Sequence, residues 1–324
     1  MTNIAIIGCG LVGVKRSKQL ASFNLVAVHD IDPTRSAAIS ESTGAKIFGD
    51  WKDIINNPGV DAVIVATRHD MLAPISLAAI KAGKHVLVEK PAAMNIEQIK
   101  EMIAAAEEHN VLVRVGFNHR YHPSIIKARE MIDEGSIGDI TYIRSQYGHG
   151  GRIGYDREWR ADPALAAGGE LVEQGIHTID LAHYFLGAFE EIGGYAGTYF
   201  WNQELDDNAF VMLKTIDNRI ASLHVSCTQW KNTFSFEIGG TKGKIEINGL
   251  GGSYGTERLT YYRVRPEMGP PDTTIWEYPQ EDRSWETEMY EFECDISKNR
   301  IPAANLESAR KCWNVINKIY EQSK

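Results

Sequence analysis

The stretch that decides the fold is Asn3-Ile4-Ala5-Ile6-Ile7-Gly8-Cys9-Gly10-Leu11-Val12-Gly13, close to the start of the chain. Its first residues read as a buried strand, and a helical pattern follows the glycines. In this context the first glycine turns tightly, the second admits a pyrophosphate, and the third lets helix and strand approach. The start of the helix then faces the phosphates. The stretch predicts a dinucleotide-binding loop, with a plain strand-to-helix connection as the alternative. The residues expected to contact the dinucleotide are Gly8, Gly10, Leu11, Val12 and Gly13.

The second strand pattern is followed by Asp30, where a carboxylate can accept hydrogen bonds from both ribose hydroxyls of an adenosine. A 2'-phosphate of NADP would be repelled by the Asp30 carboxylate, and Ile31 supplies no compensating cation. Arg35, on the next helix, would have to turn toward the phosphate to compensate. Asp30 therefore predicts NAD in preference to NADP. Asp30 could instead cap the next helix, but Asp32, directly before Pro33, is better placed to do so.

The first part of the chain, to about residue 116, alternates short apolar runs with helical patterns. This alternation predicts a doubly wound parallel sheet with right-handed crossover connections. We assign residues 1–122 to a Rossmann domain. The expected strands are Ile4–Ile7, Leu25–His29, Ala62–Ala66, His85–Val88 and Val111–Val115, and the expected helices include Met71–Ala82 and Ile96–His109.

The second part of the chain shows period-two alternation over long segments, which predicts a large, open, mostly antiparallel sheet with one covered face. We assign residues 123–324 to a second α/β domain that carries helices on one face of this sheet. The expected strands are Ile140–Gln146, Ala209–Lys214, Ile220–Ser226, Thr233–Ile238 and Lys244–Ile247. The expected helices are Pro123–Glu134, Gly169–Phe185, Trp285–Ser297 and Leu306–Gln322, and the expected loops are Gly249–Gly255 and Pro266–Pro271.

Composition limits the partners of the chain. A length of 324 residues with 43% hydrophobic content favours two packed domains. The net charge of -9 offers no basic surface for nucleic acid or anionic lipid. The four cysteines are widely spaced, as is typical of reduced, structural thiols, and the first residues contain neither a basic segment nor a long apolar one. We therefore expect a soluble cytoplasmic protein with no nucleic-acid or membrane partner.

Hydride transfer from a carbinol leaves a proton on oxygen, so the site needs a base that titrates near neutrality and a fixed positive charge. Histidine and lysine are the usual choices. Lys90, in Glu89-Lys90-Pro91, follows a buried strand at the carboxyl edge where open α/β sheets bind ligands. The segment 168–180 supplies the other candidate, His177. The alternative interpretations are that Lys90 is a solvent-exposed lysine at the end of a strand, and that His177 is a core histidine whose hydrogen bonds are made within the protein.

Glu173, His177 and Asp180 are spaced to project from one face of a helix. The same three residues, or the pair His119 and His122, also have types that bind metal. No cysteine ligands or HExxH arrangement complete such a site, so we predict no metal. Tyr147 and His149 are expected just past a strand, either facing the substrate or in a loop.

Over nearly its whole length, the chain resembles the glucose-fructose oxidoreductase, inositol dehydrogenase and rhizopine-catabolism family of oxidoreductases. Four features appear in the family's order, and together they are specific. They are the glycine loop Gly8–Gly13, the run Gly83-Lys84-His85-Val86-Leu87-Val88-Glu89-Lys90-Pro91, the turn Gly116-Phe117-Asn118-His119-Arg120-Tyr121, and the segment Gly175-Ile176-His177.

The resemblance implies that Lys90 lies beside the nicotinamide and the substrate hydroxyl, and that His177 acts as acid and base. Glu173 occupies a position where relatives commonly have Asp in contact with the substrate, and Asp180 is expected to orient substrate or histidine. Trp159-Arg160 resembles a pair that reaches the cofactor in several relatives. The remaining expected cofactor contacts are Thr67, Glu89, Lys90 and Asn118. Relatives tend to have Pro in place of Arg68 and His in place of Leu72, which leaves the cofactor packing there undetermined.

These features together predict an NAD-dependent dehydrogenase or reductase that acts on the CH–OH group of a polyhydroxylated small molecule: a sugar, nucleotide-sugar or cyclitol. The substrate-binding residues are then Lys90, Tyr147, His149, Glu173, His177 and Asp180. An NAD-using glycosidase with transient oxidation and a non-catalytic NAD-binding regulator are the alternatives. The open face of the second sheet is expected to pair with another subunit in a homodimer or homotetramer.

Overall fold

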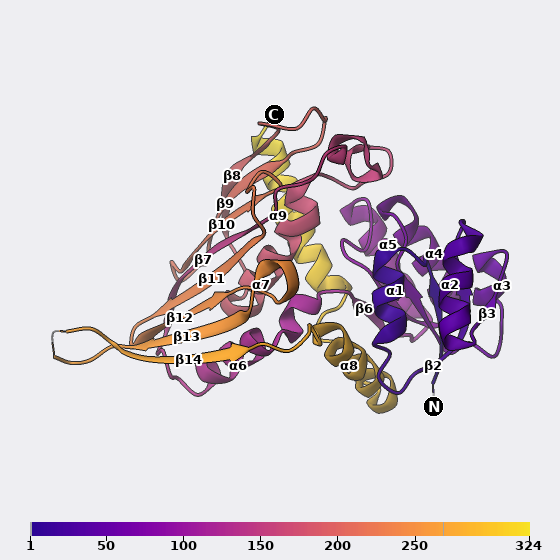
Figure 1. Cartoon of the computed structure of the whole chain (residues 1–324), viewed down its shortest axis with the longest axis horizontal. Coiled ribbons are helices and arrows are strands. Elements are labelled where there is room, and N and C mark those ends of the chain that lie inside the picture. The colour runs from indigo at the N-terminus through magenta and orange to yellow at the C-terminus, as the bar shows by residue number, and fades with distance from the viewer. Residues whose placement is uncertain (1, 268) are drawn as a thin grey trace. The chain divides into compact units, whose positions relative to one another are not determined.

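Strand β1 (Asn3–Ile7) lies inside a six-stranded parallel sheet in the computed structural model, which describes residues 2–267 and 269–324. The strand order is β3-β2-β1-β4-β5-β6, the doubly wound arrangement that the sequence predicts (Figure 1). The other strands are β2 (Asn24–His29), β3 (Lys46–Ile47), β4 (Ala62–Val65), β5 (His85–Val88) and β6 (Val113–Val115).

Helices connect the strands of this sheet. They are α1 (Leu11–Lys18), α2 (Pro33–Thr43), α3 (Trp51–Ile55), α4 (His69–Lys81) and α5 (Ile96–Glu108). Asp32 begins α2 as expected, because its side chain accepts a hydrogen bond from the Thr34 backbone N–H at 3.0 Å, with Pro33 in the first turn. The capping role thus belongs to Asp32 and not to Asp30.

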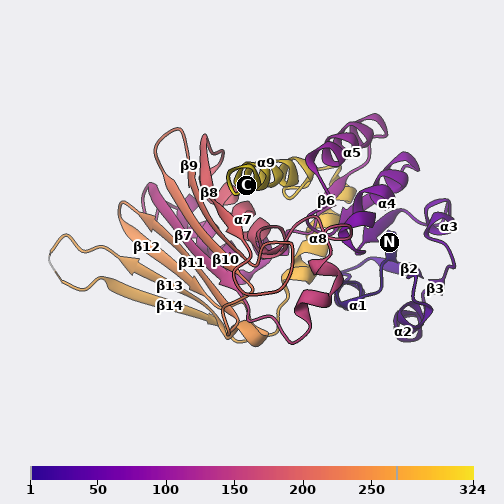
Figure 2. The same ribbon diagram turned by 90° about the horizontal axis from the view of Figure 1, so that it is seen from above.

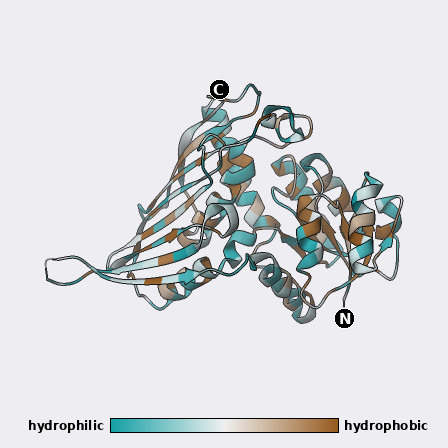
Figure 3. Ribbon diagram, in the orientation of Figure 1, coloured by the Kyte–Doolittle hydropathy of each residue, from teal (hydrophilic) through white to brown (hydrophobic). Residues whose placement is uncertain are grey.

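The chain divides into two compact units, and neither is continuous in sequence. Figure 3 shows hydrophobic residues on helices and strands of both units. The first unit comprises Met1–Asn118, Ala164–Ala167 and Trp285–Trp313; the second comprises His119–Pro163, Gly168–Ser284 and Asn314–Lys324.

The first unit takes a helix from the far end of the chain, which differs from the assignment of all residues 123–324 to the second domain. Helix α8 (Ser284–Lys298) places Met289 and Phe292, both fully buried, in one core with Ile4 and Ile6 of β1. Asp295 of the same helix pairs with the buried Arg114. The apolar face of an amphipathic helix predicts that this face is buried, but it does not predict which sheet it packs against.

The second unit is built on an eight-stranded sheet with the order β14-β13-β12-β11-β7-β10-β9-β8, in which only β7 and β10 run parallel. Five strands match expected segments: β7 (Ile140–Gly148), β9 (Asn208–Lys214), β10 (Ile220–Ser226), β11 (Thr233–Gly240) and β12 (Gly243–Asn248). Three strands toward the two edges were not expected: β8 (Glu191–Gly197), β13 (Glu257–Arg263) and β14 (Asp272–Tyr278).

The expected loops lie on either side of β13. Residues 249–255 contain a short 3-10 helix, η5 (Gly252–Tyr254), and residues 266–271 connect β13 to β14, with Met268 outside the described residues.

Helices cover one face of this sheet, as Figure 2 shows. They are α6 (Pro123–Asp133), α7 (Ile176–Leu186) and the end of α9 (Leu306–Gln322). Val225, Phe234 and Phe236 are buried on this covered face. The other face leaves large apolar side chains exposed on neighbouring strands, among them Tyr195, Phe210, Met212 and Ile220.

Within the described residues, no helix combines the length and the hydropathy needed to cross a bilayer.

Candidate active site

The glycine loop has the geometry that its sequence predicts. Gly8 adopts φ +98°, and a Cβ there would lie 2.4 Å from the carbonyl oxygen of Ala66. A Cβ on Gly13 would lie 2.0 Å from the carbonyl oxygen of Gly8, whereas one on Gly10 would meet no atom within 4 Å. The outer two glycines are therefore required by the fold, and the middle one borders open space.

The start of α1 suits an anionic group. Gly10 precedes the helix and no side chain caps it, and the first turn contains no acidic residue. Leu11 is 84% exposed at this point. Uncapped N–H groups beside the open space at Gly10 fit the pyrophosphate of a dinucleotide.

Asp30 is held beside this loop at the end of β2. Its Oδ2 accepts a hydrogen bond from the Cys9 backbone N–H at 2.7 Å, and its Oδ1 accepts one from the Asp32 N–H at 2.8 Å. Burial, together with the nearby Asp30 carboxylate, raises the pKa of the Cys9 thiol to about 12, so this cysteine is an inert structural residue. Arg35 pairs with Asp32 at 3.3 Å, an interaction that holds its positive charge on α2.

Thr67, Lys90 and Asn118 follow β4, β5 and β6, which are neighbours in the parallel sheet, so all three residues lie at its carboxyl edge. Lys90 is half-buried, and the segment after it is fixed by the Trp313 indole, whose Nε1 donates to the Pro91 carbonyl at 3.1 Å. The glycine loop follows β1 at the same edge. This edge is where ligands bind in open α/β sheets.

Glu89 has a different partner from the expected one. Its Oε1 accepts hydrogen bonds from Nε and Nη2 of Arg16 at 2.8 and 2.6 Å. The fully buried Arg16 also pairs with Glu288 of α8 through Nη1 at 2.6 Å. In the structure Glu89 therefore anchors helix α1, and a contact with the cofactor stays a prediction.

In the second unit, a single π turn, η4 (Leu171–Gly175), leads into α7 and carries Glu173. π turns within helices are rare and frequently lie at functional sites. His177 follows in the first turn of α7, and its ring stacks on that of His119 with centroids 3.9 Å apart. The predicted acid-base residue is thus fixed in position by an aromatic neighbour that the sequence analysis did not assign to catalysis.

Arg160 reaches the same helix. Its Nε lies 3.5 Å from Glu173 Oε2, and its guanidinium lies over the Trp159 ring at 4.5 Å. The expected Trp-Arg pair is therefore next to Glu173 in the second unit, and its contact with a cofactor stays a prediction.

Asp180 has a partner that the sequence did not indicate. Arg120 binds it in bidentate fashion, with Nε to Oδ2 at 2.7 Å and Nη2 to Oδ1 at 2.5 Å, and Asp180 is 1% exposed. The ion pair fixes this carboxylate, and its predicted role in orienting substrate or histidine stays a prediction. The helical spacing placed Asp180 near His177 but gave no information on a distant arginine.

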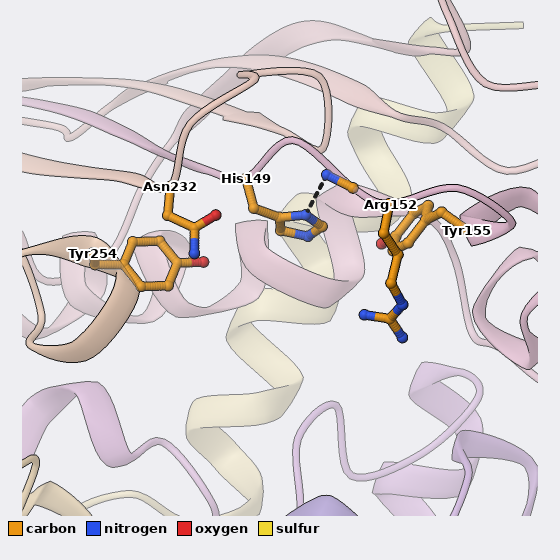
Figure 4. A pocket seen from close by; sticks show the side chains of 6 residues that line it. His149, Arg152, Tyr155, Asn232 and Tyr254 are labelled. Atoms are coloured by element: carbon orange, nitrogen blue, oxygen red, sulfur yellow. Dashed lines mark hydrogen bonds between the residues drawn. The ribbon is translucent and has the colours of Figure 1, made fainter.

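A polar cavity of about 330 Å³ lies in the second unit. Figure 4 shows its labelled side chains converging from three segments of the chain. The lining residues are His149, Gly151, Arg152, Tyr155, Asn232 and Tyr254. Only His149 was expected from the sequence; Gly151, Arg152 and Tyr155 follow it closely, Asn232 and Tyr254 lie far along the chain, and no local motif marks any of them.

His149 is neutral in this cavity. Its Nδ1 accepts a hydrogen bond from the Gly151 N–H at 3.0 Å, which places the ring proton on Nε2, 3.9 Å from Glu170 Oε2. Burial lowers the pKa of His149 below its ordinary value, and Arg152 and Arg160 act in the same direction. The ring therefore offers a neutral hydrogen-bond donor near neutral pH.

The cavity is connected to His177 through Tyr147. The Tyr147 ring lies 5.5 Å from that of Tyr254, with which it shares a side-chain hydrogen bond, and 6.5 Å from that of His177. Tyr254 also bonds to Gln174 of the π turn. Tyr147, buried within β7, thus contacts both Tyr254 of the cavity wall and the predicted acid-base residue.

Across residues 2–267 and 269–324, no three His, Cys, Asp or Glu side chains gather closely enough to hold a metal ion.

Sequence relatives of the chain include two named dehydrogenases. Levoglucosan dehydrogenase of Pseudarthrobacter phenanthrenivorans is 27% identical over 76% of this chain and 73% of that protein. The scyllo-inositol 2-dehydrogenase (NAD(+)) of Bacillus subtilis is 28% identical, over 76% of this chain and 73% of its own length. A solved structure of levoglucosan dehydrogenase with NADH and levoglucosan has the same fold, with a TM-score of 0.90, 23% identity and coverage of 99% and 97% of the two chains.

Two models of one family match consecutive parts of the chain. The oxidoreductase family NAD-binding Rossmann fold matches residues 2–117, and the GFO/IDH/MocA C-terminal domain matches residues 125–246. The first match covers the glycine loop, Asp30 and Lys90, and the second covers Tyr147, His149 and His177. The chain therefore belongs to the Gfo/Idh/MocA family of NAD-binding oxidoreductases.

Proposed function

We propose that this NAD-dependent dehydrogenase moves a hydride between nicotinamide and a secondary carbinol or keto carbon of a sugar or cyclitol. The observation that carries the proposal is His177, stacked on His119 and next to Tyr147, whose ring also contacts Tyr254 in a cavity lined with hydroxyl, imidazole, amide and guanidinium groups. Such groups donate and accept hydrogen bonds in several directions, as a ring of hydroxyls requires. The named relatives act on an anhydrosugar and on an inositol, which agrees with this substrate class.

In the first unit, the glycine loop and the start of α1 hold the pyrophosphate, and Asp30 binds the adenosine ribose. NAD, when bound, supplies the hydride acceptor. These assignments use the open space at Gly10 and the fixed carboxylate beside it.

For the substrate, we assign to His177 the removal of the hydroxyl proton during oxidation and its return during reduction. The ammonium of Lys90 stabilises the negative charge that develops on the same oxygen. Glu173, four residues before His177 and in contact with Arg160, orients a neighbouring hydroxyl. His149 and Tyr254 bind further hydroxyls inside the cavity.

The test is the absorbance of NADH at 340 nm with excess NAD and a panel of hexoses, inositols, levoglucosan, glycosides and nucleotide-sugars. Steady NADH formation with a sugar or cyclitol, lost in both Lys90→Ala and His177→Ala, is the expected result. Binding of NAD without turnover of any sugar or cyclitol contradicts the proposal. Release of monosaccharide from a glycoside without accumulated NADH instead identifies a glycosidase with transient oxidation.

Asp30→Ala is expected to lower the preference for NAD over NADP, measured as the ratio of kcat/KM values, by about 10- to 100-fold. The substitution removes hydrogen bonds between a charged group and the ribose hydroxyls, and it removes the repulsion of a 2'-phosphate. The matched control is Asp32→Ala, which loses the cap of α2 but leaves Asp30 in place. An unchanged ratio in Asp30→Ala would show that another group reads the ribose.

We also propose that the open face of the second sheet pairs two subunits, in a homodimer or homotetramer. Phe210 and Met212 on β9 are 50% and 49% exposed, beside Tyr195 at 67%. Exposed apolar side chains on adjacent strands are typical of an interface between subunits.

Light scattering is expected to give at least the mass of a dimer for the native chain. The double variant Phe210→Asp and Met212→Asp should shift this mass toward the monomer, because two buried charges would face each other across the interface. Ile301→Asp, a change at a 75% exposed residue of the first unit, is the control. A native monomer excludes the arrangement.

A further inference from the structure

Four aromatic rings lead from the wall of the cavity to the surface of the second unit. Tyr155 lines the cavity, and its ring lies 5.7 Å from that of Trp201. Trp201 packs edge-to-face on Phe200 at 5.1 Å, and Phe200 packs edge-to-face on Trp230 at 4.8 Å. Exposure rises along this series, from 8% at Tyr155 to 55% at Phe200 and 69% at Trp230. We name these four residues the aromatic run.

A buried carboxylate fixes the middle of the aromatic run. Asp207 is fully buried, and it accepts hydrogen bonds from the backbone N–H groups of Tyr199, Phe200 and Trp201 at 2.9, 2.8 and 2.9 Å. The indole Nε1 of Trp201 donates to the Cys227 carbonyl at 3.1 Å. The rings are therefore presented on an ordered segment, and little conformational entropy is lost when a ligand packs on them.

The end of the aromatic run is held in a strained backbone conformation. Trp230 has φ +57°, in the left-handed region that a bulky residue rarely adopts. Glycine would adopt this conformation without strain. Because Trp230 is 69% exposed, packing in the core does not explain why a tryptophan is present at this position. Strain of this kind is typical of functional positions.

The cavity wall is shaped to admit the two tryptophans. A Cβ on Gly150 would lie 3.1 Å from the Cα of Trp230, and one on Gly151 would lie 2.5 Å from the ring of Trp201. Gly151 itself lines the cavity, and Asn232, two residues after Trp230, lines it from the other side. The aromatic run and the cavity are thus one continuous surface.

We propose that Phe200 and Trp230 bind the second ring of a two-ring substrate, a disaccharide or a glycoside with a cyclic aglycone, whose reacting ring occupies the cavity. This proposal rests on the proposed function of the cavity as the substrate site. The cavity volume of about 330 Å³ is at the small end of the range for ligand sites, which suits a single ring. The C–H face of a pyranose is apolar, and exposed aromatic faces are the side chains that bury it best.

The first experiment compares one-ring and two-ring probes by calorimetric titration of the protein saturated with NADH, which cannot accept a hydride from the sugar. The pairs are glucose with cellobiose, maltose and trehalose, and galactose with lactose. At least one disaccharide is expected to bind about tenfold more tightly than its monosaccharide, the gain of one added aromatic contact. Trp230→Ala and Phe200→Ala should each abolish this gain and leave monosaccharide affinity unchanged.

Two controls separate the ring from its backbone. Trp230→Gly removes the same ring and relieves the strain at φ +57°, so it should lose the disaccharide gain with no drop in melting temperature. Tyr290→Ala removes a 56% exposed ring in the first unit and should change neither affinity.

The outcomes distinguish this proposal from the proposed function. If monosaccharides bind and are oxidised but no disaccharide binds more tightly, the second-ring site is excluded while the dehydrogenase stands. If no sugar binds at all, both are overturned. If Trp230→Ala lowers the mass seen in light scattering and leaves sugar affinities unchanged, a second copy of the chain covers the aromatic run and the proposal is wrong.

Discussion

His177→Asn is expected to lower kcat by about 10²- to 10⁴-fold, the usual contribution of a positioned general acid-base group. Asparagine keeps a polar side chain of similar reach but cannot exchange a proton near neutrality. The stack on His119 fixes the imidazole, so water has no equivalent position from which to replace it. The change is measured as the steady-state rate of NADH formation with the best substrate, together with the affinity for that substrate.

The matched control is His183→Asn, on the same helix but with Nδ1 at 2.8 Å from the Gly187 carbonyl, where it serves the end of α7. This variant should keep kcat near the native value. A His177→Asn enzyme that retains more than about a tenth of native kcat would reject the assignment of the proton transfer to this residue.

Arg16→Met is expected to destabilise the first unit by about 3–5 kcal/mol. The change leaves the carboxylates of Glu89 and Glu288 buried without the cation that both of them contact. The change is measured by urea unfolding followed by tryptophan fluorescence, to which Trp285 contributes; the Arg16 guanidinium lies over its ring at 4.4 Å. Lys15→Met, one residue earlier on α1 and exposed, should change the free energy of unfolding by no more than about 0.5 kcal/mol.

The loss should depend on pH in a defined direction. Burial already raises the pKa of Glu288, and removal of Arg16 takes away the main opposing influence. A carboxyl whose pKa is higher in the folded than in the unfolded state favours folding less as pH rises, so Arg16→Met should lose more stability at pH 8 than at pH 5. Adding Glu89→Gln and Glu288→Gln should restore part of the stability and remove this pH dependence.

The parts of the molecule that local geometry dictates were predictable from the sequence. Gly8 and Gly13 are required by contacts within a few residues of the turn or with the adjacent strand, so the motif and its role coincide. Asp32 caps α2 through an interaction two residues away. The buried strands of the first sheet are short and mostly apolar, which leaves few alternatives.

The parts that depend on distant partners were not predictable. Asp180 pairs with Arg120, and the cavity brings residues 149–155 together with Asn232 and Tyr254. The hydrophobic periodicity of the sequence does not predict either of these long-range contacts. The edge strands β8 and β14, and β13 beside β14, carry glycines or polar residues, because strands at or near an edge need not be apolar on both faces. The pattern of a single sequence indicates which residues are buried, but not which distant residues they contact.

Helix α8 has a consequence for the order in which the protein is made. A ribosome delivers β1 at the beginning of synthesis and Met289 and Phe292, which complete the core around Ile4 and Ile6, near its end. Until then Arg16 lacks one of its two counter-charges, and the apolar side of the first sheet has no cover from α8. The core around β1 is therefore begun first and completed only after α8 has been made, so during translation it depends on chaperones or on its own partial structure. The strands of the second sheet, in contrast, are all synthesised before α8.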